Sequence, residues 1–462
     1  MSETHADRPP AAIGLTGEIR RHAGELLRLA LPVMGARAGQ MVMVAVDTLF
    51  VGNFGTDDLA YLGLAAAPHS LVVTVLAGLL LGTIVLTAQA MGAGKPREAG
   101  AAWRRSLPYA VLLGVAGGLV LVVGGPLLFQ AAQQPAEIAI GAGRVLPVLA
   151  LGIPAAALFF TTASFLEGLK RPLPGLVFSI AANAVNALLN WVFVFGHAGL
   201  PALGAVGSAW STTIVRWALA AAMIAYVWYL RDHDRLGVRR PAPGGLLGGW
   251  RAGTQQRRIG HAAGASFGVE AAAFHGLSLL SGLMGALALG AYTVALNLLA
   301  LPFMAALGLA GATTVRVGHA HGARDRHGMA LAGWTGLGMT ALFLLPAVAA
   351  FALVPHPIAR LFAVDPALVE AIAPVVAFSA WILIADGGQV VMGQALRGRG
   401  DVWVPTFLHT ISYIVLMVPV SAALAFWAGH GLMGLFEGIL IASLFSVAIL
   451  SSRFAWLARR PV

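Results

Sequence analysis

The stretch AVLLGVAGGLVLVVGGPLLF (110–129) decides the fold class of this chain. It contains no charged side chain, and about 20 mainly apolar residues are what a helix needs to cross the ~30 Å hydrocarbon core of a bilayer. The rest of the chain is similar, because 58% of its 462 residues are hydrophobic and only 10% are charged. A water-soluble domain has roughly 25% charged residues, so we expect this chain to fold in a lipid bilayer.

Twelve stretches of this kind can be counted, which predicts an all-α membrane protein with twelve transmembrane helices in two six-helix lobes. Between the sixth and seventh lies one long polar segment that is basic and rich in Gly and Pro. The predicted organisation is an N-terminal tail (1–26), an N-lobe (27–230), a linker (231–258) and a C-lobe (259–462). The expected spans begin near Leu27, Leu59, Trp103, Ile140, Leu173, Gly204, Gly260, Ala291, Ala330, Val369, Val402 and Leu432.

The basic residues of the chain fall in alternate loops, whereas the other loops carry acids and almost no cations. Positively charged loops stay in the cytoplasm, so the pattern predicts an inner-membrane protein with both termini and the linker in the cytoplasm. The net charge of +10 is therefore not read as a nucleic-acid-binding surface. Besides the linker arginines, the basic loops hold Lys95, Arg97, Arg104, Arg105, Lys170, Arg171, Arg316, Arg324, Arg326, Arg397, Arg399, Arg453, Arg459 and Arg460.

The two halves of the sequence resemble each other at equivalent places. Gly92-Ala93 recurs as Gly322-Ala323, and Leu166-x-Gly168 recurs as Leu396-x-Gly398, both 230 positions later. Six spans per copy give the copies the same orientation, so they should be related by an axis along the membrane normal. Such pseudo-symmetric lobes with a cleft between them suit alternating access.

Several ionisable residues lie within the expected spans. Placing a charged side chain in the hydrocarbon costs at least ~2.5–3.5 kcal/mol, so such residues are expected to have a functional role. Counting 1.5 Å per residue from the nearest loop arginine places Glu270 and Asp386 about 18 and 16 Å into the C-lobe. Two carboxylates that meet at low dielectric cannot both ionise cheaply, so one keeps a proton or a cation bridges them. Both are predicted to couple ions and to bind substrate.

A second predicted site lies in the N-lobe. Asp47 is about 28 Å from the cytoplasmic end of the first span, and Asn186 and Asn190 share one face of the fifth span at a similar depth. An aspartate with amide neighbours could take up a proton or coordinate Na⁺ through oxygens. Asp47 is therefore a predicted coupling and substrate residue, although the two asparagines could equally serve as interhelical contacts.

Other polar residues of the spans are given structural roles. Glu437 is near the start of the last span and is expected at the outer interface, while His275 and His409 are expected to be satisfied packing residues. Arg37 could snorkel and is left unassigned. The chain has no cysteine and no GxxxxGK[ST] or HExxH motif, which argues against ATP hydrolysis, a cofactor and an enzyme. A protease dyad of Glu270 and Asp386 is rejected because a twelve-span repeat leaves no catalytic domain.

Particular motifs in the chain resemble those of the multidrug and toxic compound extrusion (MATE) family. They are Val46-Asp47-Thr48-Leu49-Phe50-Val51-Gly52, Asn186-Ala187-Leu188-Leu189-Asn190-Trp191, Val294-Ala295-Leu296-Asn297, Val315-Arg316-Val317-Gly318, Asp386-Gly387-Gly388-Gln389-Val390-Val391 and Leu396-Arg397-Gly398. They follow the family order over nearly all of the chain beyond its tail.

The resemblance implies a V-shaped pair of lobes that exports organic cations in exchange for H⁺ or Na⁺. Asp47, Asn186 and Asn190 match the N-lobe residues of the family, and Glu270 and Asp386 match the C-lobe pair of its NorM-like bacterial branch, where Na⁺ could bind. The residues 381–385 before Asp386 are apolar, whereas NorM-like members often have a polar group there, which tilts the expectation towards H⁺. A working monomer is expected.

Two other functions remain open from the sequence. A lipid or lipid-linked oligosaccharide flippase of the same superfamily would need a basic cleft for an anionic headgroup, whereas the charges within these spans are mostly acidic. A channel or receptor with a structural carboxylate cluster would show no uphill transport.

Overall fold

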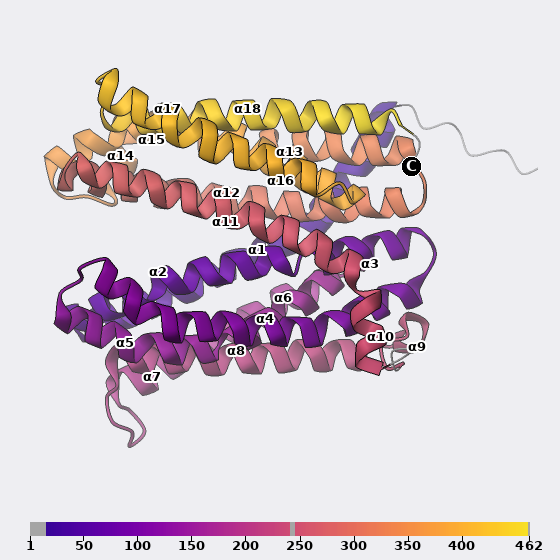
Figure 1. The fold of residues 1–462 in the computed structure, drawn as a ribbon, viewed down its shortest axis with the longest axis horizontal. Helices are drawn as coiled ribbons and strands as arrows, with labels where there is room; N and C mark the ends of the chain where they lie inside the picture. The colour runs from indigo at the N-terminus through magenta and orange to yellow at the C-terminus, as the bar shows by residue number, and fades with distance from the viewer. Residues whose placement is uncertain (1–14, 241–244, 461–462) are drawn as a thin grey trace, which may run out of the picture.

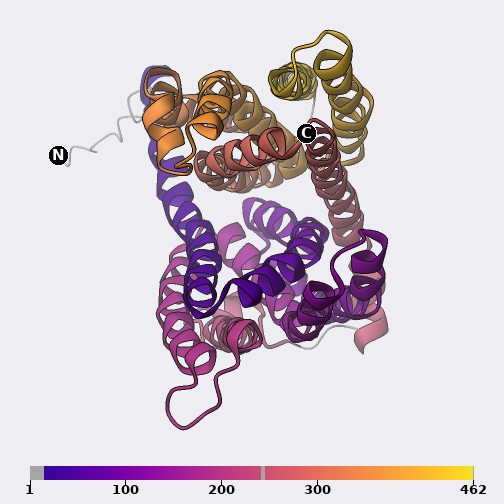
Figure 2. The same cartoon turned by 90° about the vertical axis from the view of Figure 1, so that its left-hand side faces the viewer.

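The computed structural model describes residues 15–240 and 245–460, and these form long helices joined by short turns. The N-lobe contains α1 to α8, and the C-lobe contains α11 to α18; Figures 1 and 2 show the lobes as two parallel layers of helices. The N-lobe helices are α1 (Leu15–Phe54), α2 (Thr56–Leu79), α3 (Gly82–Gly92), α4 (Pro96–Ala131), α5 (Ala136–Leu151), α6 (Ile153–Gly168), α7 (Leu173–Phe195) and α8 (Gly204–Trp228).

Two short helices, α9 (His233–Leu236) and α10 (Gly245–Ala252), lie between the lobes in the sequence. The C-lobe then contains α11 (Thr254–Leu283), α12 (Ala286–Gly322), α13 (Arg326–Leu353), α14 (Pro355–Arg360), α15 (Pro366–Arg399), α16 (Trp403–Thr410), the π-helix η1 (Ile411–Met417), α17 (Val418–Ala422), the π-helix η2 (Ala423–Trp427) and α18 (Leu432–Ala458).

The predicted spans all appear as long helical segments, six in each lobe. Three spans are built from consecutive helices: α2 with α3, α5 with α6, and α16 to η2. Among the described residues, eleven segments are long and apolar enough to cross a membrane. The one predicted span not among these eleven is the seventh, α11, which has 30 residues and carries two arginines, two histidines and Glu270. The two arginines lie in its first turns, and the helix packs against α2, α16 and α12.

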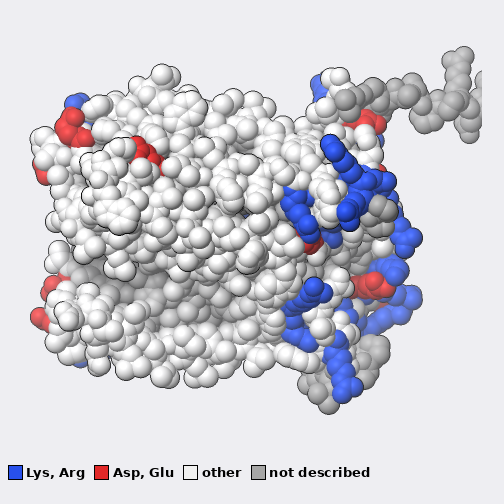
Figure 3. All heavy atoms as spheres, turned by 45° about the horizontal axis from the view of Figure 1, so that its top comes forward, with Lys and Arg blue, Asp and Glu red and all other residues white. Residues whose placement is uncertain are grey.

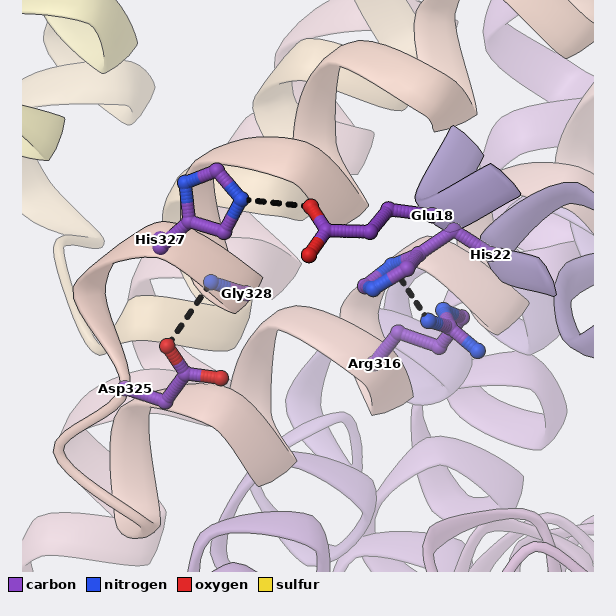
Figure 4. Close-up of polar contacts among 6 residues, drawn as sticks. All are labelled: Glu18, His22, Arg316, Asp325, His327 and Gly328. Carbon is purple, nitrogen blue, oxygen red and sulfur yellow. Dashed lines mark hydrogen bonds and ion pairs between the residues drawn. The ribbon is translucent and has the colours of Figure 1, made fainter. Parts of the chain in front are cut away.

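The helices begin earlier than the apolar stretches that predicted them. The expected start near Leu27 becomes Leu15, because α1 continues beyond the apolar stretch as a polar extension. This extension lies against the C-lobe: His22 contacts Arg316 of α12, and Glu18 contacts His327 of α13 (Figure 4). Glu25 also contacts Arg316. Residues 1–14 of the predicted tail lie outside the described residues.

The internal repeat is reproduced in the contacts between the lobes. The Gln89 side chain donates a hydrogen bond to the carbonyl of Gly398 at 2.8 Å, and His319 donates one to the carbonyl of Gly168 at 3.0 Å. Gln89 and His319 are 230 positions apart, as are Gly168 and Gly398. The two bonds are therefore equivalent under exchange of the lobes, as expected for a pseudo-two-fold axis that runs between them.

Glycines at equivalent positions allow the backbones of the lobes to meet. A Cβ at Gly92 would lie 2.0 Å from the carbonyl oxygen of His319, and a Cβ at Gly322 would lie 2.0 Å from that of Gln89. Gly78 in the same way meets Gly264. Small residues at helix crossings let membrane helices pack closely, so this is where the lobes are in closest contact.

Charged residues gather at the two ends of the molecule, and the long sides between them are almost uncharged (Figure 3). We call the end with most of the Lys and Arg side chains the basic end (Figure 3). Lys95 and Arg97, where α3 connects to α4, and Arg324, where α12 connects to α13, are exposed. The sides expose large apolar residues, such as Leu119, Val120 and Val123 on α4. Figure 3 also shows a groove between the lobes that opens at the opposite, acidic end.

Two of the residues assigned to basic loops are in fact buried. Arg316 is 7% exposed within α12, where it forms an ion pair with Glu25, and Arg397 is 3% exposed within α15. The prediction was wrong for these two residues because the helices continue past the apolar stretch and pack against the other lobe.

Candidate ion-coupling and substrate sites

The N-lobe site is centred on Asp47, which is 9% exposed in the middle of the lobe. Asn190 of α7 donates to one carboxylate oxygen at 2.8 Å, and Thr212 of α8 donates to the other at 2.6 Å. Asn186 donates to the Thr212 hydroxyl at 3.3 Å. The structure therefore brings together the three predicted residues of this lobe in one hydrogen-bonded group.

Thr212 was not predicted from the sequence, because a single hydroxyl in a span carries no distinctive signal. Its position follows from packing between α7 and α8, since Asn186 and Asn190 are fully buried on the face of α7 that Thr212 approaches. Each Asp47 oxygen accepts one bond from a neutral donor, and such donors hold a carboxylate in place without cancelling its charge.

An arginine lies one helical turn beyond Thr212. Arg216 donates to the Nε2 atom of His69 at 2.7 Å and is within electrostatic range of Asp47. No ion pair within 4.0 Å joins Asp47 to a basic group among the described residues. The carboxylate thus has a basic neighbour at longer range and its direct contacts are neutral.

The C-lobe site is centred on Asp386 of α15. One of its oxygens accepts hydrogen bonds from Gln389 at 3.1 Å, from Tyr413 at 3.2 Å and from Ser443 at 3.4 Å. Gln389 is one turn further along the same helix, Tyr413 comes from η1, and Ser443 comes from α18. Three elements therefore converge on this carboxylate.

The stretch before Asp386 is apolar and supplies no side-chain oxygen to the site, and the preference for H⁺ drawn from it stays a prediction. Oxygen atoms are supplied by other helices, namely the hydroxyls of Tyr413 and Ser443. Tyr413 lies on a π-helix, a widened turn that is common at functional sites.

Glu270 of α11 is the second predicted carboxylate of the C-lobe. The Tyr413 hydroxyl contacts Asp386, and Glu270 is within electrostatic range of both groups. Where two such carboxylates interact at low dielectric, loading with a proton or a metal cation relieves the repulsion between their charges.

His409 is buried with both ring nitrogens in hydrogen bonds, as expected of a satisfied packing residue, but its partners connect it to the C-lobe carboxylate. Its Nδ1 atom lies 2.8 Å from the Ser266 hydroxyl, and its Nε2 atom lies 2.6 Å from the Gln389 side-chain oxygen. Because Gln389 also contacts Asp386, a continuous chain of hydrogen bonds joins that carboxylate to Ser266. His275, by contrast, is exposed, and its Nδ1 atom bonds to the carbonyl of Ala271 on its own helix. Glu437 pairs with His430 near the start of α18.

A cavity of about 390 Å³ lies between the lobes. Its size is within the ~300–1,000 Å³ of small-molecule sites. Glu270 lines it, together with Arg37, which was left unassigned, and Glu167, which sequence analysis missed because it falls at the very end of its span. The other polar residues of its wall are Gln40, Thr74, Ser164, Thr314, Gln389, Gln394, Arg397 and His409.

No group of three or more His, Asp and Glu side chains that could hold a metal ion occurs in the part of the chain that the structure describes. The oxygens around Asp386 come instead from one carboxylate, a phenol and a hydroxyl, and oxygen ligands of this kind suit hard cations.

A family model described as MatE matches residues 32–192 and 269–423, which lie in both lobes. The chain belongs to the MatE family. Probable multidrug resistance protein NorM of Caulobacter vibrioides is 42% identical, with 96% of this chain and 93% of that protein aligned. Multidrug resistance protein NorM of Burkholderia vietnamiensis is 33% identical, with 99% and 97% aligned.

Solved MATE structures share the fold. A crystal structure of the eukaryotic MATE transporter AtDTX14 superposes with a TM-score of 0.86 at 20% identity, covering 96% of this chain and 99% of that one. An outward-facing multidrug resistance MATE family transporter gives 0.85 at 19% identity, covering 98% and 100%. The resemblance to NorM-like MATE proteins and the V-shaped twelve-helix fold are confirmed, and the chain is a membrane transporter and not an enzyme.

Proposed function

We propose that this MatE transporter is a secondary active antiporter that exports organic cations in exchange for H⁺ or Na⁺. The observation that carries the proposal is that each lobe holds a carboxylate inside its helix bundle, the buried Asp47 or the half-buried Asp386, whose direct hydrogen-bond partners are neutral. A carboxylate without a direct basic partner is free to exchange a proton, a metal cation and an organic cation. The NorM names of the relatives, which refer to multidrug resistance, support the same proposal.

The arrangement of the lobes suits alternating access. The contacts between Gln89 and Gly398, and between His319 and Gly168, close the lobes together at the basic end, while the groove between them opens at the acidic end. By the positive-inside rule the basic end is cytoplasmic, so this is an outward-open state of an inner-membrane protein. We further propose that both termini are cytoplasmic and that one chain, whose own two lobes enclose the central cavity, is the working unit.

In the proposed cycle, a coupling ion enters the carboxylate sites from outside and neutralises them. The organic cation then loses its electrostatic attraction and leaves through the outer groove. Release of the ion to the cytoplasm restores the negative charge that attracts the next substrate. Each elementary charge that crosses 100 mV supplies about 2.3 kcal/mol for this work.

The test is export of a fluorescent organic cation from proteoliposomes under an imposed pH or Na⁺ gradient. Uphill export driven by one of the two gradients is expected and would identify the coupling ion. Asp386→Asn should lose coupled export, whereas Glu437→Gln, which alters a carboxylate near the start of α18, serves as the matched control. Full coupled export by Asp386→Asn would refute the assignment.

A flippase for a lipid or a lipid-linked oligosaccharide is the second candidate. The specific observation in its favour is that the central cavity contains Arg37 and Arg397 in addition to acids. Headgroup-dependent lipid movement without ion coupling would support it over antiport.

A further inference from the structure

Two cavities lie where the lobes are joined by the hydrogen bonds of Gln89 and His319. The α1 cavity, of about 380 Å³, is lined by the polar extension of α1 and by His319, and the α11 cavity, of about 630 Å³, is lined by the start of α11 and by Gln89. Most residues in the wall of the α1 cavity have a counterpart 230 positions away in the wall of the α11 cavity. The two cavities are therefore copies of each other under the pseudo-symmetry of the lobes.

An ion pair between the lobes bridges the α1 cavity. Glu25 on α1 pairs with Arg316 on α12. His22 of the same helix contacts the same guanidinium (Figure 4). All three residues line the cavity. A carboxylate that belongs to one lobe thus neutralises a cation of the other lobe at this junction.

The α11 cavity does not have this ion pair, because the two equivalent positions carry other residues. The counterpart of Glu25 is Gln255, and the counterpart of Arg316 is Leu86. Both counterparts line the α11 cavity. The chain has therefore kept the cavity at this junction but has lost the carboxylate that bridges its copy.

Cations from both lobes line the α11 cavity instead. Lys95, whose counterpart in the α1 cavity is the acidic Asp325, and Arg105 belong to the N-lobe, and Arg324 belongs to the C-lobe. The acid in this wall, Glu98, pairs with Lys95 of its own lobe at 3.2 Å. Neither Arg105 nor Arg324 has a carboxylate oxygen within 4.0 Å in residues 15–240 and 245–460. Positive charge therefore lies on both walls of the α11 cavity.

The α11 cavity also contains polar atoms without partners. The Nε atom of Arg105 and the Nδ1 atom of His321 are buried and make no hydrogen bond to the part of the chain that the structure describes. Arg324 has a left-handed backbone (φ 58°) where its N-lobe counterpart is Gly94 (φ 71°). This conformation is unfavourable for a residue with a Cβ, and such strain is commonly retained at functional positions. Both features indicate that a ligand with hydrogen-bond acceptors completes the cavity.

We propose that the α11 cavity binds a phosphate group, which joins the lobes there as Glu25 joins them at the α1 cavity. Its oxygens accept hydrogen bonds from Arg105 on the N-lobe and from Arg324 on the C-lobe, since a guanidinium can donate two parallel bonds to phosphate. Because the two cations belong to different lobes, the anion binds most tightly when the basic end is closed and so favours that state. A free phosphate ion and the headgroup of an anionic phospholipid present the same oxygens.

The first test measures binding of radiolabelled inorganic phosphate to the purified full chain in phosphatidylcholine nanodiscs, with empty nanodiscs as the blank. Saturable binding is expected, and its Kd should rise about tenfold or more in Arg105→Gln and in Arg324→Gln, because each loses charge-assisted hydrogen bonds to the anion. Arg97→Gln removes an exposed cation in the first turn of α4, outside the cavity wall, and should leave Kd unchanged. Absence of saturable binding, or equal weakening in all three variants, would overturn the proposal.

The source of the phosphate group is identified by repeating the measurement in nanodiscs that also contain phosphatidylglycerol. The ionic strength is set high enough to screen the surface charge of the lipid. Loss of phosphate binding in these nanodiscs supports the proposal with a lipid headgroup as the occupant. Retention of binding supports it with the free ion as the occupant.

The second test asks whether the anion holds the lobes together, and it does not depend on transport. Glu25→Gln gives the α1 cavity the residue type of its copy and removes its ion pair, so the basic end should open more often. Spin labels at Asp234→Cys on α9, which packs against α4, and at Ser452→Cys on α18 report the separation of the lobes from positions outside both cavities.

Added phosphate, or phosphatidylglycerol if the lipid is the occupant, should shift the distances in Glu25→Gln back to shorter values. The ratio of closed to open molecules should rise about tenfold or more, because the bonds from both lobes to the anion form together only in the closed state. The shift should disappear when Arg324→Gln is added. Distances that the anion leaves unchanged, or that it shifts equally without Arg324, would overturn the proposal.

Discussion

Substitution of Gly322 by alanine should separate the lobes at the basic end. The new Cβ would lie 2.0 Å from the carbonyl oxygen of Gln89, whereas ordinary contact begins at 3.4 Å. That oxygen also accepts the backbone N–H of Ala93 at 2.9 Å, so it cannot turn away without breaking a helix-end bond. Overpacking of this kind costs about 1–3 kcal/mol. Since 1.4 kcal/mol is a factor of ten, the closed basic end should lose about 5- to 150-fold in population.

The assay is a distance between spin labels, which is straightforward because the chain contains no cysteine. Labels at Arg97→Cys and Arg324→Cys place one probe on each lobe at exposed positions of the basic end. Gly322→Ala should shift the distribution to longer distances. Gly63→Ala, where a Cβ meets nothing within 4 Å, is the matched control and should leave it unchanged. An unchanged distribution in Gly322→Ala would refute the reasoning that this contact holds the lobes closed.

Three further predictions concern single hydrogen-bonded groups. Thr212→Val removes the donor 2.6 Å from the N-lobe carboxylate. A bond to a charged group is worth ~1.5–3 kcal/mol, so the coupling-ion concentration that gives half-maximal export should change by about 10- to 150-fold. Thr212→Ser should restore the original value, and an unaltered ion dependence in Thr212→Val would contradict the assignment. Tyr413→Phe removes a hydroxyl from Asp386 and should reduce gradient-driven export at unchanged expression; equal initial rates would rule out a role for that hydroxyl. Arg171 donates two hydrogen bonds to Asp232 and so lowers the pKa of that surface carboxyl. The ion pair therefore stabilises the fold at a pH above 3.8, the ordinary pKa of the carboxyl, and this stabilisation is lost as the pH falls through the lowered pKa. Asp232→Asn should therefore lower the unfolding midpoint at pH 7 by the equivalent of less than about 1 kcal/mol and make no difference in strong acid; a difference that persists in strong acid would show another cause.

The sequence was sufficient for the parts of the fold that depend on local composition. Apolar stretches of about 20 residues predicted the spans. The 230-residue offset predicted two symmetry-related lobes, and the equivalent contacts of Gln89 and His319 agree with that symmetry. The helix ends were less predictable, because Leu15 to Leu26 form helix by packing against the other lobe rather than by apolarity.

The carboxylates of the candidate sites could also be predicted, since a charge within an apolar stretch stands out. Their partners could not. Thr212, Tyr413 and Ser443 are ordinary polar residues whose importance depends on which helix faces which. Glu167 and Arg397 were missed as cavity residues for another reason: at the ends of apolar stretches they look like loop charges, and only the fold places them between the lobes.

The most direct test of antiport is to follow ion movement that the substrate itself drives. Proteoliposomes are prepared with no ion gradient, an organic cation is added on one side, and internal pH and internal Na⁺ are recorded. The account predicts that H⁺ or Na⁺ moves opposite to the substrate and that this movement disappears in both Asp47→Asn and Asp386→Asn. Substrate entry without any counter-movement of either ion would contradict the central claim that these carboxylates exchange a coupling ion for an organic cation.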